Sequence, residues 1–124
     1  MNILGNGVDI VKNARIKKAI KNVNFIKRIY SISEIRGSKK IFNKINYFAK
    51  RYAAKEAFVK SLGTGFRNGI CFNDITIKKK TSGKPSLYVN NKVRQLIKKK
   101  FKINRFQIFL SLYDEDKYSI AYVI

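Results

Sequence analysis

The stretch FAKRYAAKEAFVKSLGTG, residues 48–65, is the segment around which the rest of the chain is organised. Ala, Lys, Arg and Leu favour helix, and neither Pro nor Gly interrupts the segment before Gly63. Apolar residues recur at helical spacing and predict one buried stripe, formed by Phe48, Tyr52, Phe58, Val59 and Leu62. Gly63 is typical of a residue that ends a helix, so the segment predicts one long helix with a glycine-rich stop.

The composition is that of one folded domain, which we expect to cover residues 1–124. Hydrophobic residues make up 45% of the chain, too many for a disordered tail. The formal net charge of +21 suits a nucleic acid, an anionic membrane, a phosphorylated ligand or an acidic protein equally well. Codon bias in a chain rich in Ile and Asn explains part of this charge just as well, so the charge alone assigns no function.

Two scarce residue types restrict the chemistry. Cys71 is the single cysteine, which excludes an internal disulfide and a zinc site built from cysteines. The sequence contains no His, which excludes His-dependent triads and His–metal sites. Apolar runs fall short of the roughly 20 residues that span a bilayer, and the N-terminus lacks the pattern of a secretion signal. We therefore expect a protein of the reducing cytoplasm.

The segments before the long helix predict one strand and three short helices. Ser31 and Glu34 fit a capping box that starts the third helix, so Glu34 is better explained as a cap than as a catalyst. The other segments are a strand over 2–11, a basic amphipathic helix over 12–22, a second helix over 25–30 and a loop over 37–40.

The segments after Gly65 are mostly strands, with one helix between them. Together with the earlier helices they predict an α+β fold. In order, they are an extended segment over 70–77 with a break at 73–74, a turn over 81–85, a strand over 87–89, a helix over 93–101 and a hairpin of strands over 106–112 and 118–124.

Asp9 interrupts the apolar run of the first strand, between Val8 and Ile10. An acid in such a place is exposed on a polar face, paired with a cation or bound to a metal. Gly5 and Gly7 precede it. Glycines in a strand mark close approach of another backbone or of a ligand, and a simple bulge or bend is the alternative.

Glu56 is the one acid in the long helical segment and lies among cations. If the fold brings Asp9 and Glu56 together, their carboxylates suit a hard cation such as Mg²⁺, held also by water and substrate phosphates. Nearby groups would then neutralise or approach phosphate, namely Arg51, Lys55, Lys60 and the turn Gly63–Gly65. An ordinary Glu56–Lys60 pair at i,i+4 spacing, and a helix that simply ends in Gly-Thr-Gly, explain the same residues equally well.

Four blocks in order along nearly the whole chain resemble the holo-acyl-carrier-protein synthase family of small phosphopantetheinyl transferases. The blocks are GNGVDIV (5–11) with 14–16, RYAAKEAFVK (51–60) with 62–65, GKP (83–85), and 110–112 with 118–121. Any one block is unspecific, whereas four in the family's order are specific. The resemblance implies the family's α+β fold, in which a long central helix packs on a small, mostly antiparallel sheet.

The resemblance also implies a reaction, the transfer of 4′-phosphopantetheine from coenzyme A to a serine of apo acyl carrier protein. The by-product is adenosine 3′,5′-bisphosphate, and the product supports fatty acid biosynthesis. Asp9 and Glu56 would hold Mg²⁺, Glu56 would accept the serine proton directly or through a metal-bound water, and Lys60 would complete the catalytic group. The coenzyme would lie against Arg51, Lys55, Lys60, Gly63, Thr64, Gly65 and Pro85, and the acidic carrier would dock on Arg15, Lys18 and Lys21. The family's homotrimer, with active sites at subunit interfaces, is implied as well.

Three positions depart from the family's pattern. Lys12 stands where an acid is common, Tyr113 where a smaller Ser or Thr is expected, and Asp114 where members carry His or an acid. These departures affect details of the coenzyme pocket rather than the reaction.

A small basic nucleic-acid-binding protein, such as a ribosomal protein, is the alternative. Lysine runs at 78–80 and 98–100, with seven Tyr and nine Phe in the chain, permit it. The acids Asp9 and Glu56 count against it, because a polyanion binder gains nothing from them. We therefore expect coenzyme A and acyl carrier protein as partners, and neither nucleic acid nor membrane.

Overall fold

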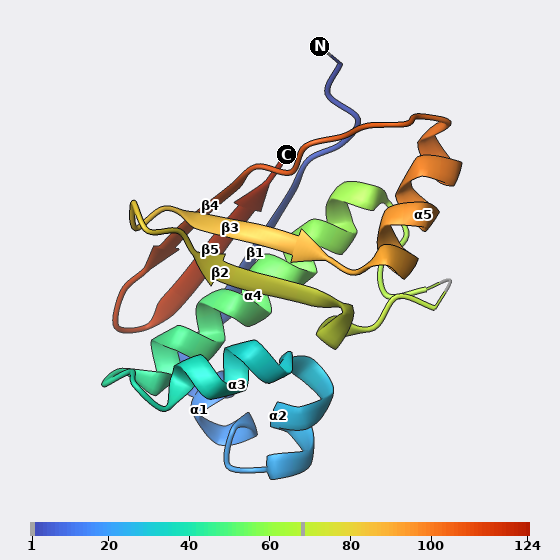
Figure 1. Cartoon of the computed structure of the whole chain (residues 1–124). Helices are drawn as coiled ribbons and strands as arrows, with labels where there is room; N and C mark the ends of the chain where they lie inside the picture. The colour runs from blue at the N-terminus through green and yellow to red at the C-terminus, as the bar shows by residue number, and fades with distance from the viewer. Residues whose placement is uncertain (1, 68) are drawn as a thin grey trace.

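The computed structural model describes residues 2–67 and 69–124 (Figure 1). Short helices and strands alternate around one long helix, α4. In chain order the elements are β1 (Gly7–Lys12), α1 (Asn13–Ala19), α2 (Val23–Ile29), α3 (Ile32–Ser38), α4 (Lys44–Leu62), the 3₁₀ turn η1 (Phe72–Asp74), β2 (Ile75–Lys79), β3 (Pro85–Val89), α5 (Asn91–Phe101), β4 (Leu110–Asp114) and β5 (Tyr118–Val123).

The helix α4 is the element on which the others pack. The Asn43 side chain caps its start by accepting a hydrogen bond from the backbone N–H of Asn46, and Gly63 ends it with a φ of 75°, as the sequence predicts. The helix contacts β1, β4 and β5 on one side and α1, α3 and β2 elsewhere. Figure 1 shows α1, α2 and α3 gathered near its N-terminal half. Small side chains allow this close packing, since four alanines of α4 are fully buried, namely Ala49, Ala53, Ala54 and Ala57.

The strands form two small antiparallel sheets. In the larger sheet β5 lies between β1 and β4, and in the smaller one β2 pairs with β3. Two predicted strands, over 2–11 and 106–112, are shorter than expected and begin at Gly7 and Leu110. The register explains both differences, because Gly7 and Leu110 lie opposite Val123, the last residue of β5.

Gly5 and Gly7 bring the backbone of the first strand segment directly against α4. A Cβ atom at Gly5 would lie 2.0 Å from the carbonyl oxygen of Ser61, and one at Gly7 would lie 2.0 Å from that of Ala57. Only glycine fits at such distances. The prediction of close backbone approach is therefore confirmed, and the partner is the long helix rather than a ligand.

The other predicted elements are present, with differences at their ends. The capping box of Ser31 and Glu34 starts α3, and η1 interrupts the extended segment before β2, both as predicted. Residues 37–38 belong to α3 rather than to a loop. Position 37 favours glycine even inside a helix, because a Cβ atom there would lie only 2.8 Å from the Tyr47 hydroxyl. Within the described part of the chain, none of the helices combines the length and apolarity needed to cross a bilayer.

Candidate active site

Asp9 reaches the candidate site because β1 presents alternate residues to α4. Gly7 and Val11 are buried on that side, whereas Val8 and Ile10 are exposed on the other face of the sheet. Asp9 shares the inner side, where its Oδ1 accepts a hydrogen bond from Lys60 Nζ at 2.9 Å. Lys60 also donates to the carbonyl oxygen of Val8 at 3.1 Å. The ion pair of Lys60 thus links strand and helix, rather than running along α4 to Glu56.

Glu56 lies on α4 one turn before Lys60 and is half-buried. Burial raises the pKa of the Glu56 carboxyl, and the negative charge of Asp9 raises it further. The Tyr52 hydroxyl, Lys60 and Arg15 act in the opposite direction. Because Lys60 stands one turn after Glu56 and pairs with Asp9, the two predicted carboxylates lie on the same side of α4.

Two converging carboxylates fit a magnesium ion. A cation between Asp9 and Glu56 would remove their mutual repulsion, and both supply the oxygen ligands that Mg²⁺ prefers. Among the described residues, no group of three or more His, Cys, Asp or Glu is arranged to hold a metal. Mg²⁺ here would therefore have two protein ligands and would depend on water and substrate phosphate for the others.

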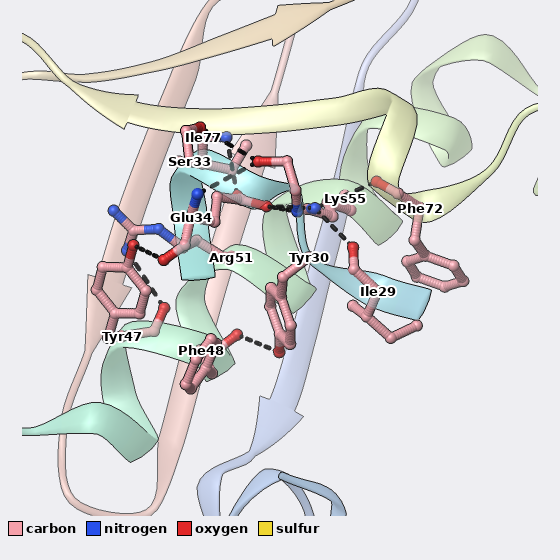
Figure 2. Close-up of polar contacts among 11 residues, drawn as sticks. Ile29, Tyr30, Ser33, Glu34, Tyr47, Phe48, Arg51, Lys55, Phe72 and Ile77 are labelled. Carbon is pink, nitrogen blue, oxygen red and sulfur yellow. Dashed lines mark hydrogen bonds and ion pairs between the residues drawn. The ribbon is translucent and has the colours of Figure 1, made fainter. Parts of the chain in front are cut away.

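Lys55 corrects one prediction, because it does not face a phosphate. Its side chain is fully buried, and Nζ donates to Glu34 Oε1 at 2.6 Å and to the carbonyl oxygens of Ile29 at 2.7 Å and Phe72 at 3.1 Å (Figure 2). The ammonium group has three donors, and all three are used. Lys55 and Glu56 are neighbours in sequence, but adjacent helical residues point about 100° apart. Flanking buried alanines, Ala53, Ala54 and Ala57, were the sequence signal for this burial.

Glu34 is the partner that the sequence only partly explains. It caps α3 as predicted, with Oε1 accepting from the backbone N–H of Ser31 at 2.9 Å. It also accepts from the backbone N–H of Ile77 on β2, through Oε2 at 3.0 Å. Figure 2 shows this carboxylate between α3, α4 and β2. Glu34 and Lys55 are therefore a buried junction that positions the neighbours of Glu56.

Arg51 lies on a different part of α4 from Glu56. Its guanidinium carbon is 3.6 Å from the centre of the Tyr47 ring, and Nη1 donates to the carbonyl oxygen of Tyr47 at 3.2 Å. Five residues along a helix correspond to a rotation of about 140°, so Arg51 and Glu56 do not share one surface of the chain. Its Nε atom is buried without a hydrogen-bond partner among the described residues.

The predicted coenzyme residues form two separate groups within one chain. Gly63 and Gly65 stand at the end of α4 with φ values of 75° and 62°, and a Cβ atom at either would meet nothing within 4 Å. Pro85 begins β3, opposite Lys79. Figure 1 shows that β3 begins at the β2–β3 turn, on the other side of the molecule from the end of α4. The structure therefore does not bring Pro85 to the Gly63–Gly65 turn.

The three predicted docking residues are all exposed on or just after α1. A shallow surface depression includes Arg15 and Lys18, together with Phe25 and Arg28 of α2. Lys21 is exposed beside it, outside its lining. Sequence analysis did not single out Phe25 and Arg28, although their i,i+3 spacing on a helix places them on one face. The basic surface thus extends from α1 onto α2.

The three departures from the family's pattern have different surroundings. Lys12 is exposed, three residues from Asp9, so strand alternation places it on the opposite face of the sheet. Tyr113 is exposed on the same outer face as Lys12, as shown by its pairing with Ile120. Asp114 accepts a hydrogen bond from Asn46 Nδ2 at 2.8 Å and lies 3.5 Å from Lys50 Nζ. Of the three, Lys12 is the one nearest to Asp9 in sequence, and its side chain points away from it.

Comparison with known proteins identifies the family. The family described as the 4′-phosphopantetheinyl transferase superfamily matches residues 5–123. A holo-[acyl-carrier-protein] synthase of Pelagibacter ubique is 58% identical over 124 residues, covering 100% of this chain and 97% of the relative. The crystal structure of the holo-[acyl-carrier-protein] synthase from Neisseria meningitidis has a TM-score of 0.90 and 33% identity, covering 98% of this chain and 97% of that one.

A further relative was solved with a ligand. The Helicobacter pylori holo-[acyl-carrier-protein] synthase in complex with coenzyme A has a TM-score of 0.81 and 30% identity, covering 96% of this chain and 97% of that one. These likenesses span nearly the full length of both chains and confirm the predicted α+β fold class. The chain belongs to the 4′-phosphopantetheinyl transferase superfamily, among the holo-[acyl-carrier-protein] synthases.

Proposed function

We propose that this chain transfers 4′-phosphopantetheine from coenzyme A to a serine of apo acyl carrier protein. The serine oxygen forms a bond to the phosphorus that carries the pantetheine, the pyrophosphate P–O bond breaks, and adenosine 3′,5′-bisphosphate leaves with the electron pair. The observation that carries the proposal is the convergence of Asp9 and Glu56 beside Lys60, in a chain of this family.

Asp9 and Glu56 are the residues that would hold Mg²⁺. When bound, the ion neutralises charge that develops on the leaving pyrophosphate oxygens. Glu56 would also accept the proton of the serine, directly or through a metal-bound water, from its half-buried position beside Lys60. Lys60, exposed at its tip, is able to turn from Asp9 to a phosphate oxygen of the coenzyme.

The coenzyme pocket is proposed to form between two copies of the chain. The Gly63–Gly65 turn and Lys60 would come from one copy, and Arg51 and Pro85 from its neighbour. Support comes from the separation, within a single chain, of Pro85 at the start of β3 from the Gly63–Gly65 turn at the end of α4. A ring of three copies, as the family resemblance implies, would hold three such sites.

The acyl carrier protein is proposed to dock on α1 and α2. Arg15, Lys18 and Lys21 offer positive charge to an acidic partner, and Arg28 adds to it. Half-buried Phe25 between them offers an apolar contact. Complementary charge of this kind raises the rate of encounter more than it raises affinity. The nucleic-acid-binding alternative gains no support from the relatives, which are holo-[acyl-carrier-protein] synthases.

The test is intact-protein mass spectrometry of apo acyl carrier protein after incubation with this protein, coenzyme A and Mg²⁺. A mass gain of one phosphopantetheine, absent when EDTA is added, is the expected result. Carrier protein with its acceptor serine replaced by alanine is the control for the attachment site. Unmodified carrier in the presence of folded enzyme would overturn the proposal.

A further inference from the structure

A cleft beside the C-terminal end of α4 is not used by the transfer steps above. Four parts of the chain enclose it: the residues before β1, the end of α4, one face of α5, and the segment that leads from α5 to β4 (Figure 1). Its volume is about 790 Å³, within the range of sites that hold small organic molecules. Of the described residues that line this α5 cleft, none belongs to the candidate metal site.

The interior of the α5 cleft is apolar. Buried side chains of α4 and α5 and half-buried side chains at and after the end of α5 contribute to it, namely Phe58, Leu62, Ile97, Phe101, Ile103 and Phe106. Ile3 and Leu4 extend the apolar lining to the surface, where both are exposed. Apolar side chains that gather in this way at a surface mark a place where an apolar group binds.

The charged side chains of the lining are all positive. They are Arg94, Lys98 and Arg105, and no Asp or Glu is among the described residues that line the cleft. Arg94 and Lys98 are four residues apart on α5, so they are neighbours on one face of that helix. The guanidinium carbon of Arg94 lies 4.9 Å from the centre of the Phe106 ring. The positive charge is therefore held directly beside the apolar lining.

This combination fits a molecule with one anionic head and a long apolar chain. A nucleic acid would offer phosphates to the cations but would leave the apolar interior unfilled. A second copy of the chain offers few free acids to three cations, since four of its seven acids pair with lysines of their own chain. A carboxylate that carries an alkyl chain uses both the positive charge and the apolar interior.

We propose that the α5 cleft binds a long-chain fatty acid. Its carboxylate lies at Arg94 and Lys98, and its alkyl chain packs against Ile97, Phe101 and Phe106. The site goes beyond the proposed function and does not rest on it, because the proposed transfer uses none of these residues. Burial of apolar surface makes binding stronger by about fourfold for each methylene group that enters the cleft.

The experiment places a fluorescent reporter in the cleft. Phe106→Trp introduces a single tryptophan, because the chain has none of its own. Laurate, kept below the concentration at which it forms micelles, is expected to shift the emission of this tryptophan to shorter wavelength. Phe42→Trp is the control reporter, because Phe42 is fully exposed and lies outside the cleft, and its emission should not change.

Calorimetry of the unaltered protein then measures the contributions of chain and head group. Decanoate, two methylenes shorter, is expected to bind roughly 15-fold more weakly than laurate. Arg94→Gln/Lys98→Gln should weaken laurate binding about tenfold or more, because hydrogen bonds to a charged head are lost. Lys39→Gln/Lys40→Gln removes the same charge at exposed positions outside the cleft and should bind laurate as the unaltered protein does. Dodecyltrimethylammonium, with the same chain length and a positive head, should bind far more weakly than laurate.

The outcomes are separable. Laurate affinity that is independent of chain length, or that is equal in Arg94→Gln/Lys98→Gln and the unaltered protein, overturns the proposal. A Phe106→Trp response to phosphatidylglycerol vesicles but not to dissolved laurate assigns the cleft to a membrane surface instead. A response to protein concentration but not to laurate assigns it to a second copy, which also overturns the proposal. Each result is read from binding alone, so it stands whether or not the protein modifies the carrier.

Discussion

Glu56 shows how the surroundings of a single acidic residue suit it to the role of metal ligand that is proposed above. On a solvated helix it would pair with Lys60, but the close approach of β1 puts Asp9 beside it and draws Lys60 to the strand. The result is a carboxylate that is half-buried and next to a like charge, which is costly without a cation. The proposed role of Glu56 therefore depends on two glycines, Gly5 and Gly7, that take no part in the reaction but let the first strand approach α4.

Replacing Glu56 with glutamine is expected to leave the fold intact and to abolish transfer. The amide keeps the size of the side chain but removes the charge that holds the metal and accepts the proton, a loss of about 10²-fold or more in turnover. Stability should stay equal or rise slightly, because the repulsion with Asp9 disappears. The measurements are the carrier mass-gain assay and urea unfolding.

Asp116→Asn is the control for Glu56→Gln, since Asp116 is an exposed acid in the turn after β4. Its transfer rate should match that of the unaltered protein. A folded Glu56→Gln protein with near-normal turnover would show that Glu56 is not a ligand of the catalytic metal.

Among the elements, the Glu34–Lys55 ion pair joins α3, α4 and β2, and both side chains are fully buried. A lysine this buried is easily mistaken for a phosphate ligand, because in sequence it stands next to Glu56 among other cations. Burial lowers its pKa, and the charge of Glu34 opposes that change. Removing either side chain of the pair alone would leave the other charge buried without a partner and would destabilise the fold.

Lys55→Met is expected to destabilise the protein by about 3–5 kcal/mol, because it leaves the Glu34 charge buried without a partner. The double variant Glu34→Gln/Lys55→Met should be more stable than Lys55→Met alone, since the uncompensated charge is gone. Urea unfolding measures both, and Lys50→Met, a half-exposed lysine of the same helix, is the control. Unchanged stability with lost coenzyme binding would restore Lys55 as a phosphate ligand.

Asp74 joins η1 to the start of α5, and it gives the stability a pH dependence. Burial raises its pKa, but hydrogen bonds from Lys92, the Cys71 N–H and Asn90 together outweigh burial and leave it below its ordinary value of 3.8. A carboxyl with a lowered pKa in the folded state stabilises the fold above its ordinary pKa and loses this effect as the pH falls through the lower value.

Asp74→Asn should therefore be less stable than the unaltered protein at pH 7, and the difference should close as the pH falls below 3.8. Urea midpoints measured from pH 7 to pH 2.5 test this expectation. Asp116→Asn, which changes an exposed acid outside this cluster, again serves as the control. If the urea midpoints of Asp74→Asn and the unaltered protein differ by the same amount at every pH, the effect comes from the introduced amide group and not from the loss of the Asp74 charge.

At the scale of the whole molecule, sequence patterns predict the elements better than they predict the site. Periodicity alone gives the helix that ends at Gly63 and the hairpin of β4 and β5, because each pattern reports which residues face a core. The meeting of Asp9 and Glu56 follows from the family resemblance, since 47 positions separate them and spacing cannot join them. The prediction that Lys55 faces a phosphate is wrong, because the flanking alanines indicate a buried face but not whether the lysine there meets a phosphate or Glu34.

The outer face of the larger sheet carries an apolar surface that one chain leaves exposed. Its members come from β1, the residue before β4, β4 itself and β5, and they are Val8, Ile10, Phe109, Tyr113, Tyr118 and Tyr122. A continuous exposed apolar face of this kind marks a site of association. Because the predicted coenzyme residues form two separate groups, association would also complete the active site.

The family resemblance implies a ring of three chains, so we expect a trimer with a mass three times its 14.4 kDa chain. Ile10, with 58% of its surface exposed, lies on the outer face, so Ile10→Glu should separate the subunits while each chain stays folded. Ile32→Glu on α3, where Ile32 is 70% exposed, changes charge equally but should leave the trimer intact. Light scattering after size exclusion measures the mass, and the carrier assay measures transfer. If dissociated Ile10→Glu is fully active, each chain holds a complete site, and the proposal that Pro85 and the Gly63–Gly65 turn meet across an interface fails.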